Sequence, residues 1–371
     1  MTKRERMLAA LRREDVDRPP ATPDIHLMFP VKHRGYTQWD VKGPRATVPI
    51  WKVRLDTYRE FDMDAWIQQG IAFSGPKNVK GSSKMIRETG DEYEEEITQE
   101  TPKGVVTSRI VHPKQEGEWF SKYPFEDPPN DQEKAECFLD FDPEDGHDLS
   151  EYRKVYDELG DDGLVFCSQG GPAIDWWLGM CGSQKGIYDV MDRPDELRPL
   201  FDRYNDLLLK RTEIACREGV EVVEGGGSCT SLSLINPALY REFVFPVLRE
   251  QAEICHRHGS YLVVQINGRA NGALEMLKEA EVDCTFPLER PPLADVDIGD
   301  AKRRIGDRVC LMGNLDPINT LLRGTPEDVE QEVKEIMEAA GPTGLIVSTS
   351  DQTPRDTDPK NLEAFRRAVE G

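Results

Sequence analysis

The sequence of 371 residues lacks the features that mark several large classes of protein. It holds no apolar run long enough to cross a bilayer, and its first residues are charged rather than an apolar signal core, so we expect neither membrane insertion nor export. No Gly-x-Gly-x-x-Gly or Gly-Lys-Ser/Thr loop follows a predicted strand, which argues against a nucleotide cofactor. The eight cysteines are scattered, with no Cys-x-x-Cys pair. Reduced thiols in a cytoplasm are therefore the expectation.

Basic residues are also in the minority. Lys and Arg number 47 against 69 Asp and Glu, which gives a formal net charge of −22. Such a charge repels phosphate backbones and anionic lipid surfaces, so neither nucleic acid nor a membrane is predicted as a partner. Hydrophobic residues make up 38% of the chain, which is enough for a sizeable core. We therefore predict a globular protein whose partner is a small molecule.

The sequence does contain a regular alternation of short apolar runs and helical segments. The apolar runs predict six strands in the second half, at 164–167, 220–223, 261–264, 284–286, 309–312 and 345–347. Helices are predicted between them or after them, at 184–217, 237–258, 270–280, 295–305, 326–340 and 359–370. This alternation predicts parallel strands joined by crossover helices. Two further strands near 21–27 and 62–67 make eight, which favours an α/β fold of the closed (β/α)8 TIM-barrel type over an open doubly wound sheet.

We expect a single domain over residues 1–371, because barrels of this kind often reach such a length as one unit. Helices are also predicted at 2–13 and 50–60. Residues 76–125 alternate charged and β-branched residues with several glycines, which predicts a hairpin-like insertion. Residues 124–150 are rich in Pro, Asp and Glu, a composition typical of a solvated connecting loop.

The candidate site follows from where the predicted strands end, because barrel active sites lie at the C-terminal ends of the strands. The apolar run 261–264 stops abruptly at Gln265, Asn267 and Gly268. Gln265 and Asn267 occupy alternate positions and so point to the same side. Each buried amide there must find a partner or cost about 1–3 kcal/mol. A bound polar ligand would supply those partners.

Other predicted strand ends carry further polar residues. The candidates are Asp24, His26, Glu224, Arg269, Glu289, Asn314 and Asp351. Trp176, which follows a Gly-Gly-Pro loop, is a candidate wall for an apolar substrate and equally a cover for the barrel rim.

Structural explanations compete with these functional ones. Glu224 and its three glycines also fit a tight loop in which glycine supplies positive φ. Asn314 and Asp316 fit an Asx turn that caps the next helix. The segment Cys255–His258 has the composition of a metal cluster, but it ends a predicted helix, where cationic side chains meet free carbonyls. We predict a structural role for that segment.

Several segments resemble the uroporphyrinogen decarboxylase superfamily, which also includes cobalamin-linked methyltransferases. The similarity spans nearly the whole chain and is carried by Glu5–Leu11 with Asp17–Pro19, Tyr240–Phe243 with Pro246, Asp307–Pro317, Leu322–Pro326 and Asp356–Asn361. The resemblance implies a (β/α)8 barrel whose mouth is open to a large ligand or to a corrinoid carrier protein. A homodimer is compatible with the resemblance.

The chain departs from this superfamily at the residues that carry its chemistry. The decarboxylase binds substrate carboxylates with an Arg-Gln-Ala-Gly-Arg segment, and this chain has Asp24–Met28 in its place. The decarboxylase also has a His in its final loop, at the position that corresponds to Asp351 here. Zinc-dependent members bind the metal with His-x-Cys and a later Cys, where this chain has Gln265, Asn267 and Asp351. Amide oxygens are poor zinc ligands. We therefore expect neither porphyrinogen decarboxylation nor a catalytic metal; an oxygen-rich site for a harder ion than zinc is the alternative.

The leading hypothesis is a methyltransferase or demethylase that moves a methyl group from a small O- or N-methylated compound to a corrinoid cofactor carried by a partner protein. An acid would protonate the leaving group, and the candidates for it are His26, Glu224 and Asp351. Substrate contacts would come from Asp24, Trp176, Gln265, Asn267, Arg269, Glu289 and Asn314.

One alternative function is a decarboxylase of another acid, whose carboxylate would be held by Arg269 or Arg290. Another is a barrel that binds a ligand without catalysis.

Overall fold

Seven parallel strands form the centre of the molecule and curl into a barrel-like sheet. The computed structural model describes residues 1–371. The strands follow one another in the order β1 (Ala65–Gln68), β8 (Gly163–Ser168), β9 (Val222–Gly226), β10 (Tyr261–Gln265), β11 (Cys284–Leu288), β12 (Cys310–Leu315) and β13 (Leu345–Thr349). Each of the six strands predicted in the second half is present. The fold is therefore α/β and TIM-barrel-like, as the sequence predicted.

The eighth strand predicted at 21–27 is not formed, and this part of the prediction was wrong. Only Ala21 makes a parallel bridge, to Val347 of β13. The Ala21 carbonyl accepts from Asp64 N at 3.0 Å, next to β1, so the segment lies between the two edges of the sheet. Pro20 and Pro23 have no N–H to donate, which prevents a regular ladder here.

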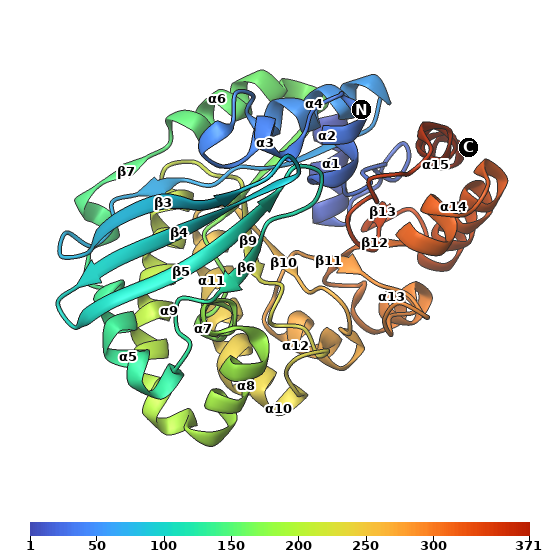
Figure 1. Ribbon diagram of the computed structural model, residues 1–371. Helices are drawn as coiled ribbons and strands as arrows, with labels where there is room; N and C mark the ends of the chain where they lie inside the picture. Colours follow the sequence, from blue (N-terminus) through green and yellow to red (C-terminus); the bar gives the residue numbers. More distant parts are fainter.

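Helices alternate with the strands and surround the sheet (Figure 1). They are α1 (Lys3–Arg12), α2 (Met28–His33), α3 (Gln38–Val41), α4 (Ile50–Glu60), α5 (Pro128–Cys137), α6 (Ser150–Leu159), α7 (Ala173–Cys181), α8 (Ser183–Asp192), α9 (Pro194–Arg217), α10 (Pro237–Leu239), α11 (Phe245–Arg257), α12 (Leu274–Glu279), α13 (Ile298–Ile305), α14 (Pro326–Ala340) and α15 (Pro359–Glu370). The helix predicted at 184–217 is two helices, because Pro194 cannot donate within a helix and instead starts α9 at its first position. No helix is long and apolar enough to cross a membrane.

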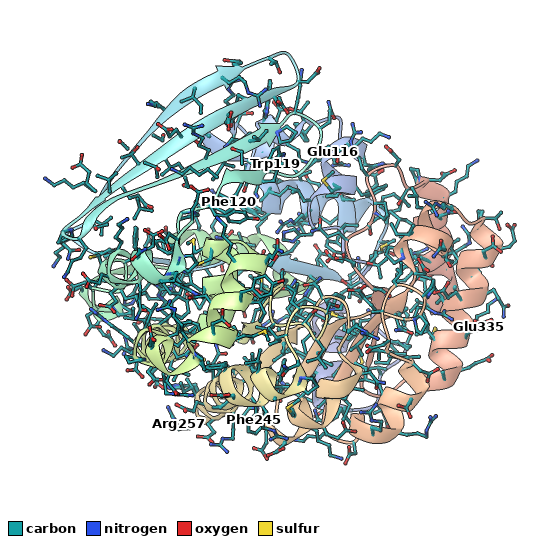
Figure 2. All side chains as sticks on the ribbon, turned by 60° about the horizontal axis from the view of Figure 1, so that its bottom comes forward. Glu116, Trp119, Phe120, Phe245, Arg257 and Glu335 are labelled. Carbon is teal, nitrogen blue, oxygen red and sulfur yellow. The ribbon has the colours of Figure 1, made fainter.

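The insertion is larger than the hairpin that the sequence predicted. It is an antiparallel sheet of four strands, β3 (Lys80–Glu88), β4 (Glu92–Thr101), β5 (Gly104–Pro113) and β6 (Trp119–Lys122). Figure 1 shows this sheet on the opposite side of the view from α14 and α15. In Figure 2, Trp119 and Phe120 of β6 lie on the side of this sheet nearer the barrel helices, whereas Phe245 and Arg257 of α11 lie at the far edge of the molecule.

The segment 124–150 is not the plain loop that its composition predicted. It contains α5 and the short strand β7 (His147–Asp148), which pairs antiparallel with β2 (Ala72–Phe73). Pro128 occupies the first turn of α5, where its missing N–H costs nothing, so a proline-rich segment can still form a helix.

The interior of the barrel is packed rather than hollow. One hydrophobic cluster of 87 buried residues extends through the strands and the surrounding helices and includes Val106 of the insertion. Successive side chains along a strand point to opposite faces of the sheet. The outward-facing side chains pack against the helices, and the inward-facing ones fill the barrel. The polar members of the inward set gather at the C-terminal strand ends.

Candidate active site

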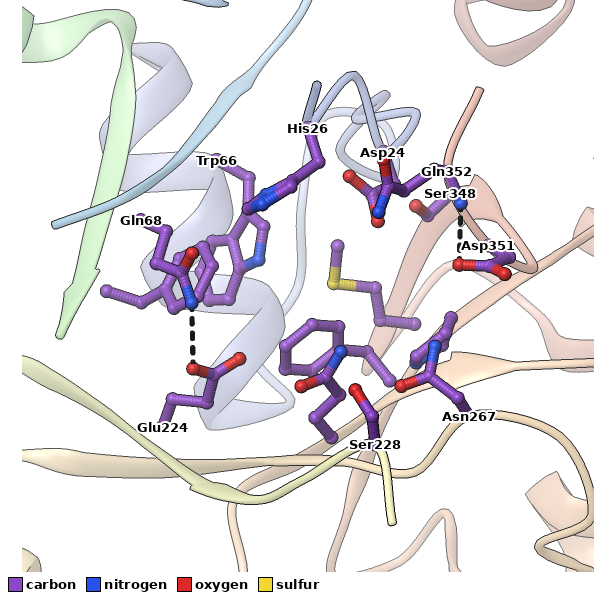
Figure 3. Close-up of a pocket in the computed structure, with 15 residues that line it drawn as sticks. Asp24, His26, Trp66, Gln68, Glu224, Ser228, Asn267, Ser348, Asp351 and Gln352 are labelled. Atoms are coloured by element: carbon purple, nitrogen blue, oxygen red, sulfur yellow. Dashed lines mark hydrogen bonds between the residues drawn. The ribbon is translucent and has the colours of Figure 1, made fainter. Parts of the chain in front are cut away.

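A cavity of about 270 Å³ opens at the C-terminal ends of the parallel strands. It is the site that barrel architecture favours. Figure 3 shows Glu224 on one side of this cavity and Asp24 and Asp351 on the other. The full lining consists of Asp24, His26, Trp66, Gln68, Phe166, Glu224, Ser228, Gln265, Asn267, Phe286, Pro287, Met312, Ser348, Asp351 and Gln352.

Three aromatic rings form an apolar wall of this cavity. Trp66 and Phe166 stack with their ring centroids 4.5 Å apart, and they come from the neighbouring strands β1 and β8. Phe286 of β11 meets both rings edge-on, at 5.9 and 6.0 Å. Met312 adds a polarisable thioether to the lining. The wall can therefore hold methyl groups and exclude water from one side of a ligand.

Carboxyl groups dominate the polar lining. Glu224 is buried within β9, and Gln68 Nε2 donates to its Oε2 at 3.1 Å. Burial raises the pKa of Glu224, although hydrogen bonds from Ser168 and Gln68 oppose the rise. Asp351 has an exposed side chain at the mouth, yet the protein atoms around it still desolvate the carboxyl and raise its pKa.

Asp24 is the most strongly perturbed of these carboxyls. Burial raises its pKa to about 7, and the nearby charge of Asp351 adds to the effect. Arg54 opposes the rise, and Glu224 contributes a smaller increase from across the cavity. The Asp24 carboxyl is therefore about half protonated at neutral pH. A small change in the cavity can shift this balance toward the protonated or the ionised form.

His26 is neutral under the same conditions. Burial, assisted by the positive charges of Arg54 and Lys42, lowers its pKa to about 3. The buried Arg54 donates to the His26 carbonyl and, at 3.1 Å, to Nε2. Because guanidinium only donates, Nε2 accepts and the ring proton resides on Nδ1. His26 is thus a hydrogen-bond donor in the cavity wall, and its predicted role as an acid stays a prediction.

The amides predicted from the end of β10 are part of the cavity lining. Gln265 and Asn267 both line it, and the buried Oδ1 of Asn267 has no hydrogen-bond partner within the protein. Gly226 allows the neighbouring strand to approach: its φ is +79°, and a Cβ there would lie 2.3 Å from the Gln265 carbonyl oxygen. The unpaired oxygen of Asn267 marks a place for a ligand donor.

Comparison with known proteins identifies the family. The uroporphyrinogen decarboxylase family model matches residues 152–371, more than half of the chain. The chain belongs to the uroporphyrinogen decarboxylase family. This confirms the resemblance found in the sequence.

The relatives differ in their names and in their distance from this chain. Uroporphyrinogen decarboxylase from Shewanella halifaxensis is 27% identical over 251 residues, which cover 64% of this chain and 68% of the relative. The enzyme of the same name from Pseudomonas putida strain GB-1 is 31% identical over 185 residues, 48% of this chain and 49% of that protein. A methyltransferase from Methanosarcina mazei has a similar structure, with a TM-score of 0.66 and 16% identity over 100% of this chain and 98% of the other. This similarity shows that the two proteins share a fold.

Six of the ten predicted site residues line the cavity in this member of the family. They are Asp24, His26, Glu224, Gln265, Asn267 and Asp351. Arg269 is exposed and lies 3.7 Å from Asp295, and Glu289 accepts a hydrogen bond from Gly268 N. Neither residue is part of the lining.

Asn314 and Trp176 also lie outside the cavity lining. Asn314 Nδ2 donates to the carbonyls of Leu288 and Val296 at 2.9 and 3.2 Å, so its amide secures the loop after β11. Trp176 stacks on Tyr204, with their ring centroids 4.7 Å apart. The role of Asn314 is therefore structural, but it is not the predicted cap. Asp316 makes that cap, because its Oδ1 accepts hydrogen bonds from Ile318 N and Asn319 N, both at 2.8 Å.

The aromatic wall and Gln68 were missed by the sequence prediction. Trp66 and Phe166 sit inside apolar runs and are indistinguishable there from ordinary core residues. Gln68 had a usable signal, because the run ending in Gln68, Gln69 and Gly70 repeats the pattern of amides and glycine that singled out Gln265. The same reasoning applied to both strand ends would have found it.

Metal-binding side chains are not assembled anywhere in the chain. No group of three or more His, Cys, Asp or Glu side chains is placed to hold a metal ion. In the Cys255–His258 segment, His256 lies 3.0 Å from Asp283 and His258 lies 2.6 Å from Glu213. These side-chain contacts are consistent with the structural role predicted for that segment.

Proposed function

We propose that this chain is an enzyme that transfers a methyl group from a small methylated compound to a Co(I) corrinoid presented by a partner protein. One observation carries the proposal. The cavity is small and its lining includes three carboxyl groups and an aromatic wall but neither lysine nor arginine.

This composition argues against the reaction named for the sequence relatives. A substrate whose carboxylate is to be removed needs a cation to hold it, and carboxylates facing it would repel it by several kcal/mol at protein dielectric. A cavity of about 270 Å³ also lies just below the usual range for a site that holds a drug-sized ligand, and a tetrapyrrole is larger than such a ligand. The decarboxylase alternative therefore has no support from the lining.

A corrinoid does not fit inside this cavity either, for the same reason of size. We therefore treat the corrinoid as a substrate that reaches the mouth, near Asp351 and Gln352, and not as a resident cofactor. The methyl donor occupies the cavity with a methyl group directed outward. When bound at the mouth, a Co(I) corrinoid supplies the nucleophile that accepts the methyl group.

The chain's own residues hold and orient the donor. Trp66, Phe166 and Phe286 pack against its apolar part and keep water from that side. The free Oδ1 of Asn267 accepts a hydrogen bond from it. Glu224 and Asp24 face its polar centre from two sides of the cavity. Fixing the donor in this way supplies the alignment that a displacement at carbon needs.

An anaerobic assay tests this proposal. The purified chain is mixed with cob(I)alamin and, one at a time, with aryl methyl ethers, methylated amines and quaternary methylammonium compounds. Methylcobalamin absorption is expected with at least one donor. In parallel, carboxyl-labelled acids are incubated with the chain alone. Release of labelled CO2 without corrinoid, together with no methyl transfer from any donor, would show a decarboxylase instead.

A further inference from the structure

The charges around the cavity are unbalanced toward the negative. Asp24, Glu224 and Asp351 line it from three different segments of the chain. Arg54 is the cation that opposes the raised pKa of Asp24. Arg54 is itself committed, because it donates to both the carbonyl and Nε2 of His26 and does not line the cavity. Lys42 acts on His26 but, like Arg54, does not line the cavity, so three carboxyl groups line it without a lining cation.

The aromatic wall suits the same kind of ligand. Cations are attracted to the faces of aromatic rings, and most strongly to tryptophan, when water is excluded. Trp66 stands in the wall together with Phe166 and Phe286, and all three rings are nearly buried. Carboxylates combined with aromatic rings are the side chains that recognise methylated ammonium groups, which are positively charged but covered by apolar methyls.

The opposite kind of ligand is disfavoured by the same lining. An anionic donor would face three carboxyl groups with no lining cation to receive it. A neutral donor would gain from the rings but would leave the carboxyl groups uncompensated when they ionise. The net charge of −22 on the whole chain adds a long-range attraction for cations.

We propose that the ligand of this cavity is a methylated ammonium cation, held between the aromatic wall and the carboxylates of Asp24 and Glu224. This names the substrate class of the proposed function and rests on that function for its chemistry, although not for binding. In the transfer, the C–N bond breaks and its electron pair stays on nitrogen, while Co(I) supplies the pair for the new Co–C bond. The amine leaves neutral, so no proton is needed.

In this proposal the carboxyl groups act as anions that bind a cation and not as acids that donate a proton. The two roles predict opposite changes with pH. With Asp24 having a pKa of about 7 in the empty cavity, a bound cation favours the ionised form. Affinity for a cation should therefore rise as pH increases through 7. A role as proton donor would instead make the enzyme lose activity over the same interval.

Isothermal titration calorimetry with a matched pair of ligands tests the proposal. Choline carries a trimethylammonium group, and 3,3-dimethylbutan-1-ol has the same shape with carbon in place of nitrogen and no charge. We expect choline to bind at least about 30-fold more tightly at pH 8, the size of a desolvated cation–π and carboxylate contribution. Between pH 5.5 and 8.5 choline affinity should rise about tenfold or more, while binding of the alcohol stays constant.

Variants assign the effect to this cavity. Asp24→Asn and Glu224→Gln should each weaken choline binding at least tenfold and leave the alcohol unaffected. Asp192→Asn, which removes the same charge from an exposed site on α8, should change neither. Equal affinity of the wild-type chain for the two ligands, or choline binding that survives both substitutions, overturns the proposal. The wild-type pH comparison remains decisive even if a variant fails to fold.

The outcome separates this inference from the proposed function. If choline binds as expected but no methylammonium compound donates a methyl group, the ligand class stands and methyl transfer fails. If a neutral or anionic donor yields methylcobalamin and choline does not bind, methyl transfer stands and the ligand class fails.

Discussion

Replacing Asp24 by asparagine together with Glu224 by glutamine should lower kcat/KM for a methylammonium donor by about 10²- to 10⁴-fold. Each carboxylate contributes a charge-assisted contact of roughly 1.5–3 kcal/mol to the bound cation, and each factor of ten corresponds to about 1.4 kcal/mol. The substitutions keep the shape of both side chains. Steady-state kinetics of methylcobalamin formation measure the effect.

The same double variant should be more stable than the wild type at pH 8. The pKa of Asp24 in the folded chain, about 7, lies above its ordinary value of 3.8. The folded state therefore holds the proton more tightly, and stability falls as pH rises between these two values. Asparagine removes this loss, so the gain in melting temperature should be larger at pH 8 than at pH 5. Unchanged kinetics, or a lower melting temperature at pH 8, would contradict the assignment.

Replacing Asp64 by asparagine should destabilise the fold by about 3–5 kcal/mol, since it removes the charge from a buried ion-pair network. The Asp64 side chain is fully buried and accepts from Arg6 Nη1 at 2.6 Å, Arg18 Nη1 at 2.8 Å and Ala21 N at 2.8 Å. These contacts fasten the Ala21 segment to the edge of β1. Urea denaturation followed by circular dichroism measures the loss.

Asp62→Asn is the matched control for this change. Asp62 also pairs with basic residues, Lys3 at 2.7 Å and Arg366 at 3.4 Å, but its side chain is 64% exposed. Solvent screens such a pair, so the substitution should cost less than about 1 kcal/mol. If the two variants lose equal stability, the network around Asp64 does not hold the N-terminal segment as described.

The strands were predictable where an apolar run in the sequence becomes a strand that is buried in the folded protein. Strands β8 to β13 are buried on both faces and read as continuous apolar runs between helices. The strand predicted near Ala21 did not form because Pro20 and Pro23 have no N–H to donate, a signal that the sequence contains and the prediction did not use. The α5 helix was missed because its prolines were read as loop residues, although they occupy its first turn.

The candidate site was predictable only in its polar half. Gln265 and Asn267 stand out because amides interrupt an apolar run. Trp66 and Phe286 do not, since a ring that faces a cavity and a ring that faces the core have the same sequence context. Asn314 stands at a strand end just as Gln265 does, but its amide is satisfied by two carbonyls of the chain. Only three-dimensional contacts separate these cases.

A crystal structure of the chain with tetramethylammonium tests the central claim most directly, because this ion is the part that all quaternary methylammonium compounds share. The account predicts the cation inside the cavity, against Trp66 and between the carboxylates of Asp24 and Glu224. A cavity that holds only water while the cation sits on exposed carboxylates, or an anion bound in the cavity, would contradict it.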